Sequence, residues 1–367
     1  MKLSCSNTVL AGLFLSSAHG QDCETKLIAF GDSLTDNGNL YGITGGALPP
    51  ALGYAEGRFT NGFVWVEFLA DALGLARPAP RYPAASGTNY AVAGASTGDG
   101  ETSTWTPMLT GAPTTLPALG VRRQVDDFVA DVAAGAHPNL CADSPVVLWG
   151  GPAEMVVLGG APAYEDMLED LAGSVAALID GAGLTNIIVL NVPPLFAAPA
   201  ANGVPSLFVP ATLPGEDLAG NIPAYNAGLL PLLEEMRGEH ACVEITHVDA
   251  FSIIGGIAGD PAGYGIEGDF MTPVINETAL FTMNELEYTN VANAFWFDGV
   301  HPTETVHEIV AGEFYKVLTQ ETEQKVSKGC KTGKGTKAPK KGKKEGKTSK
   351  GGKTKKNKTG KKTAAPE

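Results

Sequence analysis

Two polar segments, far apart in the sequence, carry residue types that together can move a proton on and off a hydroxyl group. Ser33 lies just beyond the short apolar run 27–30. His301 stands three residues after Asp298, and Pro302 then suits the first turn of a following helical pattern. A carboxylate at this spacing bonds one ring nitrogen and leaves the other free to take a serine proton. We therefore interpret Ser33 as a candidate nucleophile, His301 as its base and Asp298 as the acid that orients the base.

Each of these residues also has an ordinary structural interpretation. A Gly-Asp-Ser tripeptide is common in turns, and a histidine in a loop is more often a surface residue. We expect surface positions for the other histidines of the domain, which are His137, His240, His247 and His307. His301 differs from these four histidines because it has an aspartate three residues before it and lies after the last predicted strand.

The elements that must position these residues alternate along the chain. Short apolar runs bounded by turn residues predict buried strands at 27–30, 88–92, 146–149, 187–190 and 245–248. Apolar residues at helical spacing lie between them, for example at 64–73, 121–132, 164–179 and 224–236. This alternation predicts a parallel sheet with helices on both faces. Open sheets of this kind bind ligands at the carboxyl ends of their strands, where Ser33 is placed.

Five segments in the same order resemble the GDSL family of SGNH hydrolases, over 28–318. They are 31–39, 57–67, 89–95, 191–195 and 298–301. The resemblance implies an α/β fold, a three-layer α/β/α sandwich with a five-stranded parallel sheet that is flavodoxin-like. It also implies that Ser33, Asp298 and His301 are catalytic, with no metal or organic cofactor. The N–H groups of Ser33 and Gly94 would then stabilise the oxyanion.

One position departs from the family pattern. The segment Gly151-Pro152-Ala153-Glu154 falls where the family carries Gly-x-Asn-Asp, so Ala153 replaces an asparagine that donates to the oxyanion. Losing one such donor costs about 100- to 1000-fold in turnover. Glu154 as an anion would repel the developing charge. Asn37, Asn39 or a water molecule is a conceivable substitute.

The ends of the chain predict export and a separate tail. Residues 1–20 have a short apolar run that ends in small residues, as in a signal peptide, and no later stretch has the length of a membrane span. Four cysteines then remain, and they predict two disulfides with three possible pairings: Cys23, Cys141, Cys242 and Cys330. The sequons at Asn276 and Asn357 would be glycosylation sites in a eukaryotic source.

Charge divides the chain near Gln324. Residues 1–324 carry 9 basic and 38 acidic residues, a net charge of −29, whereas 325–367 carry 17 lysines and 2 glutamates, a net charge of +15. We therefore predict a hydrolase domain over 21–324 and a disordered, Lys-rich tail over 325–367. The tail is either a solvated segment, an anchor to an extracellular polyanion or a partner of the acidic domain. Nucleic acid is disfavoured because the tail has neither arginine nor aromatic residues.

These features favour a secreted, extracellular and monomeric serine esterase or lipase that acts on a small-molecule or polymeric ester. The alternative is a binding or matrix protein that keeps the hydrolase fold, with Ala153 marking weakened catalysis and the tail anchoring it to polyanions.

Overall fold

The computed structural model describes residues 23–82, 87–107, 109–157, 164–209 and 215–327. Its strands are β1 (Ile28–Gly31), β2 (Thr102–Trp105), β3 (Thr114–Pro117), β4 (Pro145–Trp149), β5 (Asn186–Leu190) and β6 (Glu244–Val248). Its α-helices are α1 (Asn39–Ile43), α2 (Trp65–Leu73), α3 (Val121–Ala133), α4 (Pro152–Val157), α5 (Tyr164–Ala176), α6 (Gly215–Glu239), α7 (Ala250–Gly259), α8 (Glu277–Met283) and α9 (Glu304–Ser327). The predicted signal peptide, the Asn357 sequon and most of the predicted tail lie outside these ranges.

The central sheet has four parallel strands in the order β1-β4-β5-β6, within the part of the chain that the structure describes. Four of the five strands predicted from apolar runs are therefore confirmed, as is the α/β class. The two remaining strands, β2 and β3, form a separate antiparallel pair. The predicted count of five strands in the main sheet is wrong, because residues 88–92 do not form a regular strand.

Side chains explain why this fifth segment is irregular. It runs alongside β1, and the N–H of Tyr90 donates to the carbonyl of Ala29 at 2.8 Å. On its other side, the amide Nδ2 of Asn39 donates to the carbonyls of Asn89 and Ala91 at 2.8 and 2.7 Å. Backbone pairing away from β1 is limited to Asn89, whose N–H donates to the carbonyl of Ala79 and whose carbonyl accepts the N–H of Arg81, both at 2.9 Å, so the segment is held partly by a side-chain amide and lacks a full ladder of backbone bonds.

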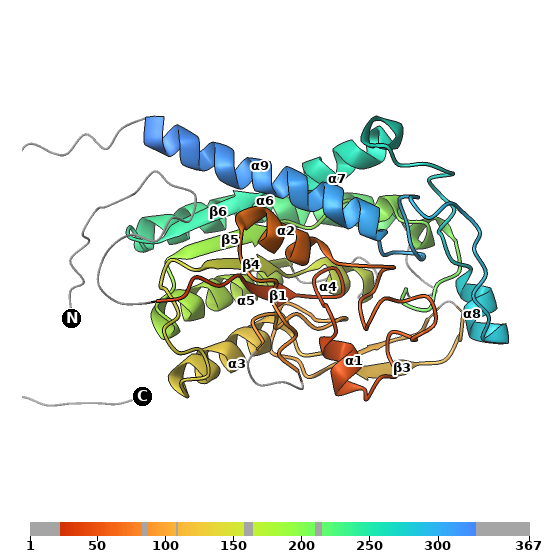
Figure 1. Cartoon of the computed structure of the whole chain (residues 1–367), viewed down its shortest axis with the longest axis horizontal. Coiled ribbons are helices and arrows are strands. Elements are labelled where there is room, and N and C mark those ends of the chain that lie inside the picture. Colours follow the sequence, from red (N-terminus) through yellow and green to blue (C-terminus); the bar gives the residue numbers. More distant parts are fainter. Residues whose placement is uncertain (1–22, 83–86, 108, 158–163, 210–214, 328–367) are drawn as a thin grey trace, which may run out of the picture. The chain divides into compact units, whose positions relative to one another are not determined.

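Alternate residues of the strands point to two different cores, one on each face of the sheet. Leu27, just before β1, and Ala29, within it, pack with side chains of α2, α7 and α9. Even-numbered positions, such as Ile28 and Phe30, pack with α3, α5 and the second half of α6. Figure 1 shows α2 and α9 on one side of the sheet and α3 and α5 on the other. The predicted three-layer arrangement is thus confirmed.

The last helix returns to the beginning of the chain. It begins at Glu304, two residues after Pro302, so the prediction that Pro302 lies in its first turn is wrong. The Thr303 hydroxyl, rather than proline, caps the helix by accepting from the N–H of Val306 at 3.4 Å. The packing of α9 against α2 places the loop before α9 beside the segment that follows β1.

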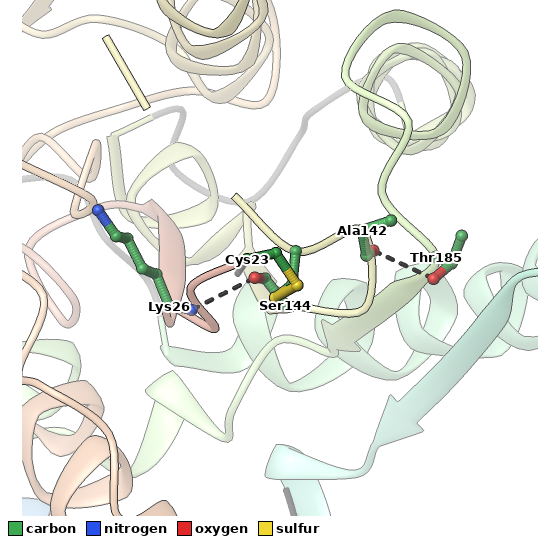
Figure 2. The surroundings of a disulfide bond; sticks show 6 residues. Cys23, Lys26, Ala142, Ser144 and Thr185 are labelled. Carbon is green, nitrogen blue, oxygen red and sulfur yellow. Dashed lines mark hydrogen bonds between the residues drawn. A yellow bond between two sulfur atoms is a disulfide. The ribbon is translucent and has the colours of Figure 1, made fainter. Parts of the chain in front are cut away.

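A disulfide ties the segment before β1 to the segment before β4. Cys23 and Cys141 are joined, with their Cα atoms 5.0 Å apart. Beside it the N–H of Lys26 donates to the Ser144 hydroxyl, as Figure 2 shows. One predicted disulfide is therefore present. Cys330 lies outside the described residues, so the second disulfide stays a prediction.

Candidate active site

The structure brings Ser33, His301 and Asp298 into one chain of hydrogen bonds. The Nε2 atom of His301 lies 2.9 Å from the Oγ atom of Ser33, and its Nδ1 atom lies 2.7 Å from an oxygen of Asp298. Asp298 is fully buried, and its other oxygen accepts the N–H groups of Val300 and His301 at 2.9 and 2.7 Å. With a proton on Nδ1, the neutral imidazole presents Nε2 as an acceptor to the serine hydroxyl.

The end of β1 is held so that Ser33 faces the edge of the sheet. Gly31 has φ of +156°, and a Cβ atom there would lie 2.8 Å from the carbonyl oxygen of Trp149 on the neighbouring strand. Only glycine fits this close approach. The buried amide of Gln124, on α3, accepts the N–H of Gly31 and donates to its carbonyl at 3.0 and 2.9 Å. The backbone before Ser33 is therefore fixed from both sides.

The loop that carries His301 is braced by the segment after the nucleophile. The Thr60 hydroxyl donates to the carbonyl of Pro302 at 2.8 Å, and the Asn61 side chain accepts the N–H of Glu304 at 2.8 Å. These bonds hold the chain on the C-terminal side of His301. They give a physical reason for the Gly-Arg-Phe-Thr-Asn-Gly segment found in the sequence.

A buried ion pair fixes that bracing segment in turn. The guanidinium of Arg58 donates two bonds to the carboxylate of Glu67, at 2.8 and 2.7 Å. Glu67 also accepts the N–H of Val64 at 3.1 Å, so it closes the first turn of α2. Two-point pairing of this kind restricts geometry more than a single bond does.

Two residues that the sequence analysis did not single out support Asp298. The Tyr54 hydroxyl, which is buried, donates to the same oxygen of Asp298 that faces His301, at 2.9 Å. Glu277 accepts the N–H of Gly299, inside the Asp298–His301 loop, at 2.8 Å. Neither residue carries a sequence signal for this role, because Tyr54 is 244 positions from its partner and Glu277 is only an acidic first residue of a helix.

Glu277 connects the Asp298–His301 loop to a second loop. Its other oxygen accepts the N–H of Leu207 at 2.9 Å and the hydroxyl of Ser206 at 3.2 Å. Burial, reinforced by the charge of Asp298, raises the pKa of Glu277 to about 8. Two buried carboxyl groups in one small region repel each other when both are ionised, so the proton on Glu277 relieves that repulsion.

The two predicted backbone donors line the same cavity. Among the described residues, neither the N–H of Ser33 nor that of Gly94 has a hydrogen-bond acceptor, and both residues line the cavity next to His301. Asp36 links their two loops, because one of its oxygens accepts the N–H of Ala93 at 2.9 Å and the N–H of Leu40 at 3.1 Å. A carbonyl oxygen placed between these N–H groups would be polarised.

Ala153 also lines this cavity, and it brings no side-chain donor. Its N–H is already taken, since it donates to an oxygen of Asp32 at 2.7 Å. The two asparagines conjectured as substitutes are wrong, because the side-chain amides of Asn37 and Asn39 donate to the carbonyls of Pro78 and of residues 89 and 91 instead. The missing donor is therefore not replaced by either asparagine.

Glu154 turns away from the cavity. Its carboxylate accepts both the N–H and the hydroxyl of Thr97, at 2.8 and 2.7 Å. Asp32, by contrast, lines the cavity, and burial raises its pKa to about 6 although backbone N–H groups oppose that shift. A neutral Asp32 below this pH reduces the negative charge near the position of the oxyanion.

Apolar side chains form most of the cavity wall. The rings of Phe59 and Phe208 lie 5.1 and 5.5 Å from the imidazole of His301. The volume of the cavity is about 600 Å³, a figure that includes open solvent at its mouth. Its aliphatic and proline walls come from Leu34, Leu40, Ala93, Leu116, Pro152, Val156, Leu195 and Val300. Such a wall suits an apolar group next to the reacting carbonyl.

The surface position predicted for two other histidines is wrong. His137 is buried, with its ring 2.9 Å from the hydroxyl of Tyr90. His307 is buried as well, and its Nδ1 atom accepts the N–H of Trp65 at 3.2 Å. Both have structural partners that lie far away in the sequence. Among the described residues, no cluster of histidine, cysteine or acidic side chains has the arrangement of a metal site.

A serine, histidine and aspartate hydrogen-bonded in this order at the carboxyl edge of a parallel sheet form the layout of an α/β serine hydrolase. Residues 27–314 match the GDSL-like lipase/acylhydrolase family, and the chain belongs to that family. The part of the chain that carries the match includes every residue of the site described above.

Individual relatives are distant. The chain is 23% identical over 340 residues to the anther-specific proline-rich protein APG of Arabidopsis thaliana, covering 79% of this chain but only 61% of that protein. It is also 23% identical to a GDSL esterase/lipase of the same plant, covering 82% of this chain and 91% of the relative. A GDSL-like lipase structure from Bacteroides thetaiotaomicron aligns with a TM-score of 0.36 and 14% identity, over 82% of this chain and 89% of the other.

Within the described residues, no helix is long and apolar enough to cross a bilayer.

Proposed function

We propose that the protein hydrolyses carboxylic esters through an acyl-enzyme on Ser33. The observation that carries this proposal is the unbroken set of contacts from Ser33 through His301 to Asp298, beside a cavity with two backbone donors. The Ser33 hydroxyl attacks the ester carbonyl while His301 takes its proton, and the N–H groups of Ser33 and Gly94 bind the oxyanion. His301 then protonates the leaving alcohol and activates the water that releases the acid.

The walls of the cavity favour an apolar acyl group. Phenylalanine, leucine, valine and proline side chains surround the position next to Ser33, and among the lining residues only Asp32 and His301 can carry charge. A relative of similar length is named a GDSL esterase/lipase, which agrees with this substrate class. Esters with an apolar acyl part are therefore the proposed substrates, whether the alcohol part is small or polymeric.

We also propose that the protein acts outside the cell. The sequence pattern of residues 1–20 supports export, and the disulfide between Cys23 and Cys141 is of the kind that persists in oxidising compartments. The net charge of +15 over 325–367 supports retention on an extracellular polyanion by exposed lysines.

Hydrolysis of p-nitrophenyl esters by the wild type and by Ser33→Ala tests the enzymatic proposal. We expect Ser33→Ala to lower kcat by about 10,000-fold or more, because the nucleophile is lost while the fold is kept. Ser252→Ala, at an exposed serine on α7, is the matched control and should keep the wild-type rate. If the wild type hydrolyses none of the esters, or if Ser33→Ala retains the full rate, the esterase proposal is wrong and the binding-protein alternative gains.

A further inference from the structure

A second apolar cavity lies behind the first. Its volume is about 450 Å³, a figure that includes open solvent at its mouth. It is enclosed by the tryptophans of α2 and β4 and by the first turns of α9, on the face of the sheet that α2 and α9 cover. Its lining residues that do not touch the first cavity include Trp65, Trp149, Ile254, Phe295, Val306 and Val310.

The two cavities share part of their walls. Leu34, Leu195 and Val300 line both. Leu34 directly follows Ser33, and Val300 directly precedes His301, so this partition stands next to the two reacting side chains. All three side chains are aliphatic, and each is slightly exposed. An alkyl chain that passes from the first cavity to the second would therefore meet only hydrocarbon, and its passage requires these three side chains to change rotamer.

The second cavity carries no charge at neutral pH. His307 is the one titratable residue in its wall, and burial lowers the pKa of His307 to about 3. Two of the three indole N–H groups are satisfied, because Trp65 donates to the Thr35 hydroxyl and Trp149 to the carbonyl of Asn191. The third, that of Trp296, is buried without a partner among the described residues, so the wall offers a polar sugar one indole donor, whereas a hydrocarbon chain needs no hydrogen-bond partner.

We propose that this second cavity holds the far end of the substrate's acyl chain, so that the preferred substrates are esters of medium- or long-chain acids. This inference rests on the proposed ester hydrolysis at Ser33. The observation that supports it is the aliphatic wall of Leu34, Leu195 and Val300 that the two cavities share. Each additional methylene that is transferred from water to an apolar cavity raises kcat/KM up to about fourfold.

A series of p-nitrophenyl esters from acetate to dodecanoate, below their micellar concentrations, tests the inference. Val310→Phe fills the second cavity from α9, and Ile254→Ala enlarges it from α7. Val317→Phe makes the same change on α9 at a residue that lines neither cavity. It is the matched control for the cost of overpacking.

We expect the wild-type kcat/KM to rise at least tenfold from butyrate to decanoate. Val310→Phe should lower the ratio of decanoate to acetate at least tenfold, Ile254→Ala should move the optimum to longer chains, and Val317→Phe should leave the ratio unchanged. A wild-type profile that is flat or falls beyond butyrate overturns the inference. So does an unchanged profile in folded Val310→Phe or, if that variant does not fold, in Ile254→Ala. These results leave Ser33-dependent hydrolysis of short esters intact, whereas failure of the proposed function would remove it for every ester.

Discussion

The two sides of the candidate active site differ in the number of hydrogen bonds that support them. On the base side, Asp298 accepts four hydrogen bonds, from Tyr54, from the His301 ring and from two backbone N–H groups, and Glu277 holds the loop between them. On the oxyanion side, Ala153 presents only a methyl group, and its N–H is occupied by Asp32.

This difference teaches that positioning of the base and stabilisation of the oxyanion are separable parts of the site. Substitutions on the base side can only remove hydrogen bonds. After each removal, the remaining hydrogen bonds still hold Asp298 and His301 in place. The oxyanion side lacks a donor, so a substitution there can add one. The largest increase in rate that we expect from a single substitution in this site therefore lies at Ala153.

Ala153→Asn should raise kcat by about 10- to 100-fold, because it restores a side-chain donor to the cavity wall next to Ser33 and Gly94. Hydrolysis of p-nitrophenyl butyrate measures the effect. Ala153→Leu has nearly the same size without the donor and should give no gain. Equal rates for the two variants would show that the oxyanion is already fully stabilised and would remove the contrast between the two sides.

Tyr54→Phe should lower kcat about tenfold with KM nearly unchanged, because Asp298 loses one hydrogen bond to a buried charge and holds His301 less firmly. Steady-state kinetics separates the two constants. Tyr90→Phe removes a hydroxyl that donates to Asp131 at 2.6 Å on the far face of the sheet, and it should cost stability but not kcat. A similar loss of kcat in both variants would mean that general destabilisation explains the result.

Glu277→Gln should mainly change how the free energy of unfolding depends on pH. The folded chain keeps the proton of Glu277 until about pH 8, whereas the unfolded chain releases it near pH 4.5. The wild type should therefore lose up to about 1.4 kcal/mol of unfolding free energy per pH unit as pH rises toward 8, and the variant should not lose this contribution.

The difference between the slopes of the wild type and the variant from pH 6.5 to 8 isolates Glu277, because the shifted pKa values of Asp32, Asp36 and His307 contribute equally to both proteins. Urea unfolding at both ends of that window gives the slope. Glu169→Gln, at an exposed glutamate of α5, should retain the wild-type slope. Parallel slopes for Glu277→Gln and the wild type would contradict the proposed protonation of Glu277.

The residues that the sequence could identify are those whose meaning depends on local spacing. Ser33 beyond an apolar run, and Asp298 three residues before His301, can be recognised without knowing the fold. Tyr54 and Glu277 could not be recognised, because each acts through a contact with a residue 244 or 22 positions away.

The same limit explains the predictions that were wrong. Residues 88–92 have the composition of a strand, yet their backbone pairing away from β1 is limited to Asn89, and the Asn39 side chain binds the carbonyls of Asn89 and Ala91. His137 and His307 are polar residues with no local reason for burial, and only Tyr90 and Trp65, brought close by the fold, satisfy them. The spacing of apolar residues predicts which apolar side chains are buried. It does not predict hydrogen bonds between polar residues that lie far apart in the sequence.

The packing of α9 against α2 also sets when the protein can become active. Ser33 is among the first residues of the domain to be synthesised, whereas His301 and the helix that holds its loop are among the last. Chains fold as they emerge, beginning at the N-terminus. By the proposed mechanism, a nascent chain therefore has a serine without its base until translation of the whole domain is complete, and we expect unfinished products to leave the esters of the producing cell intact.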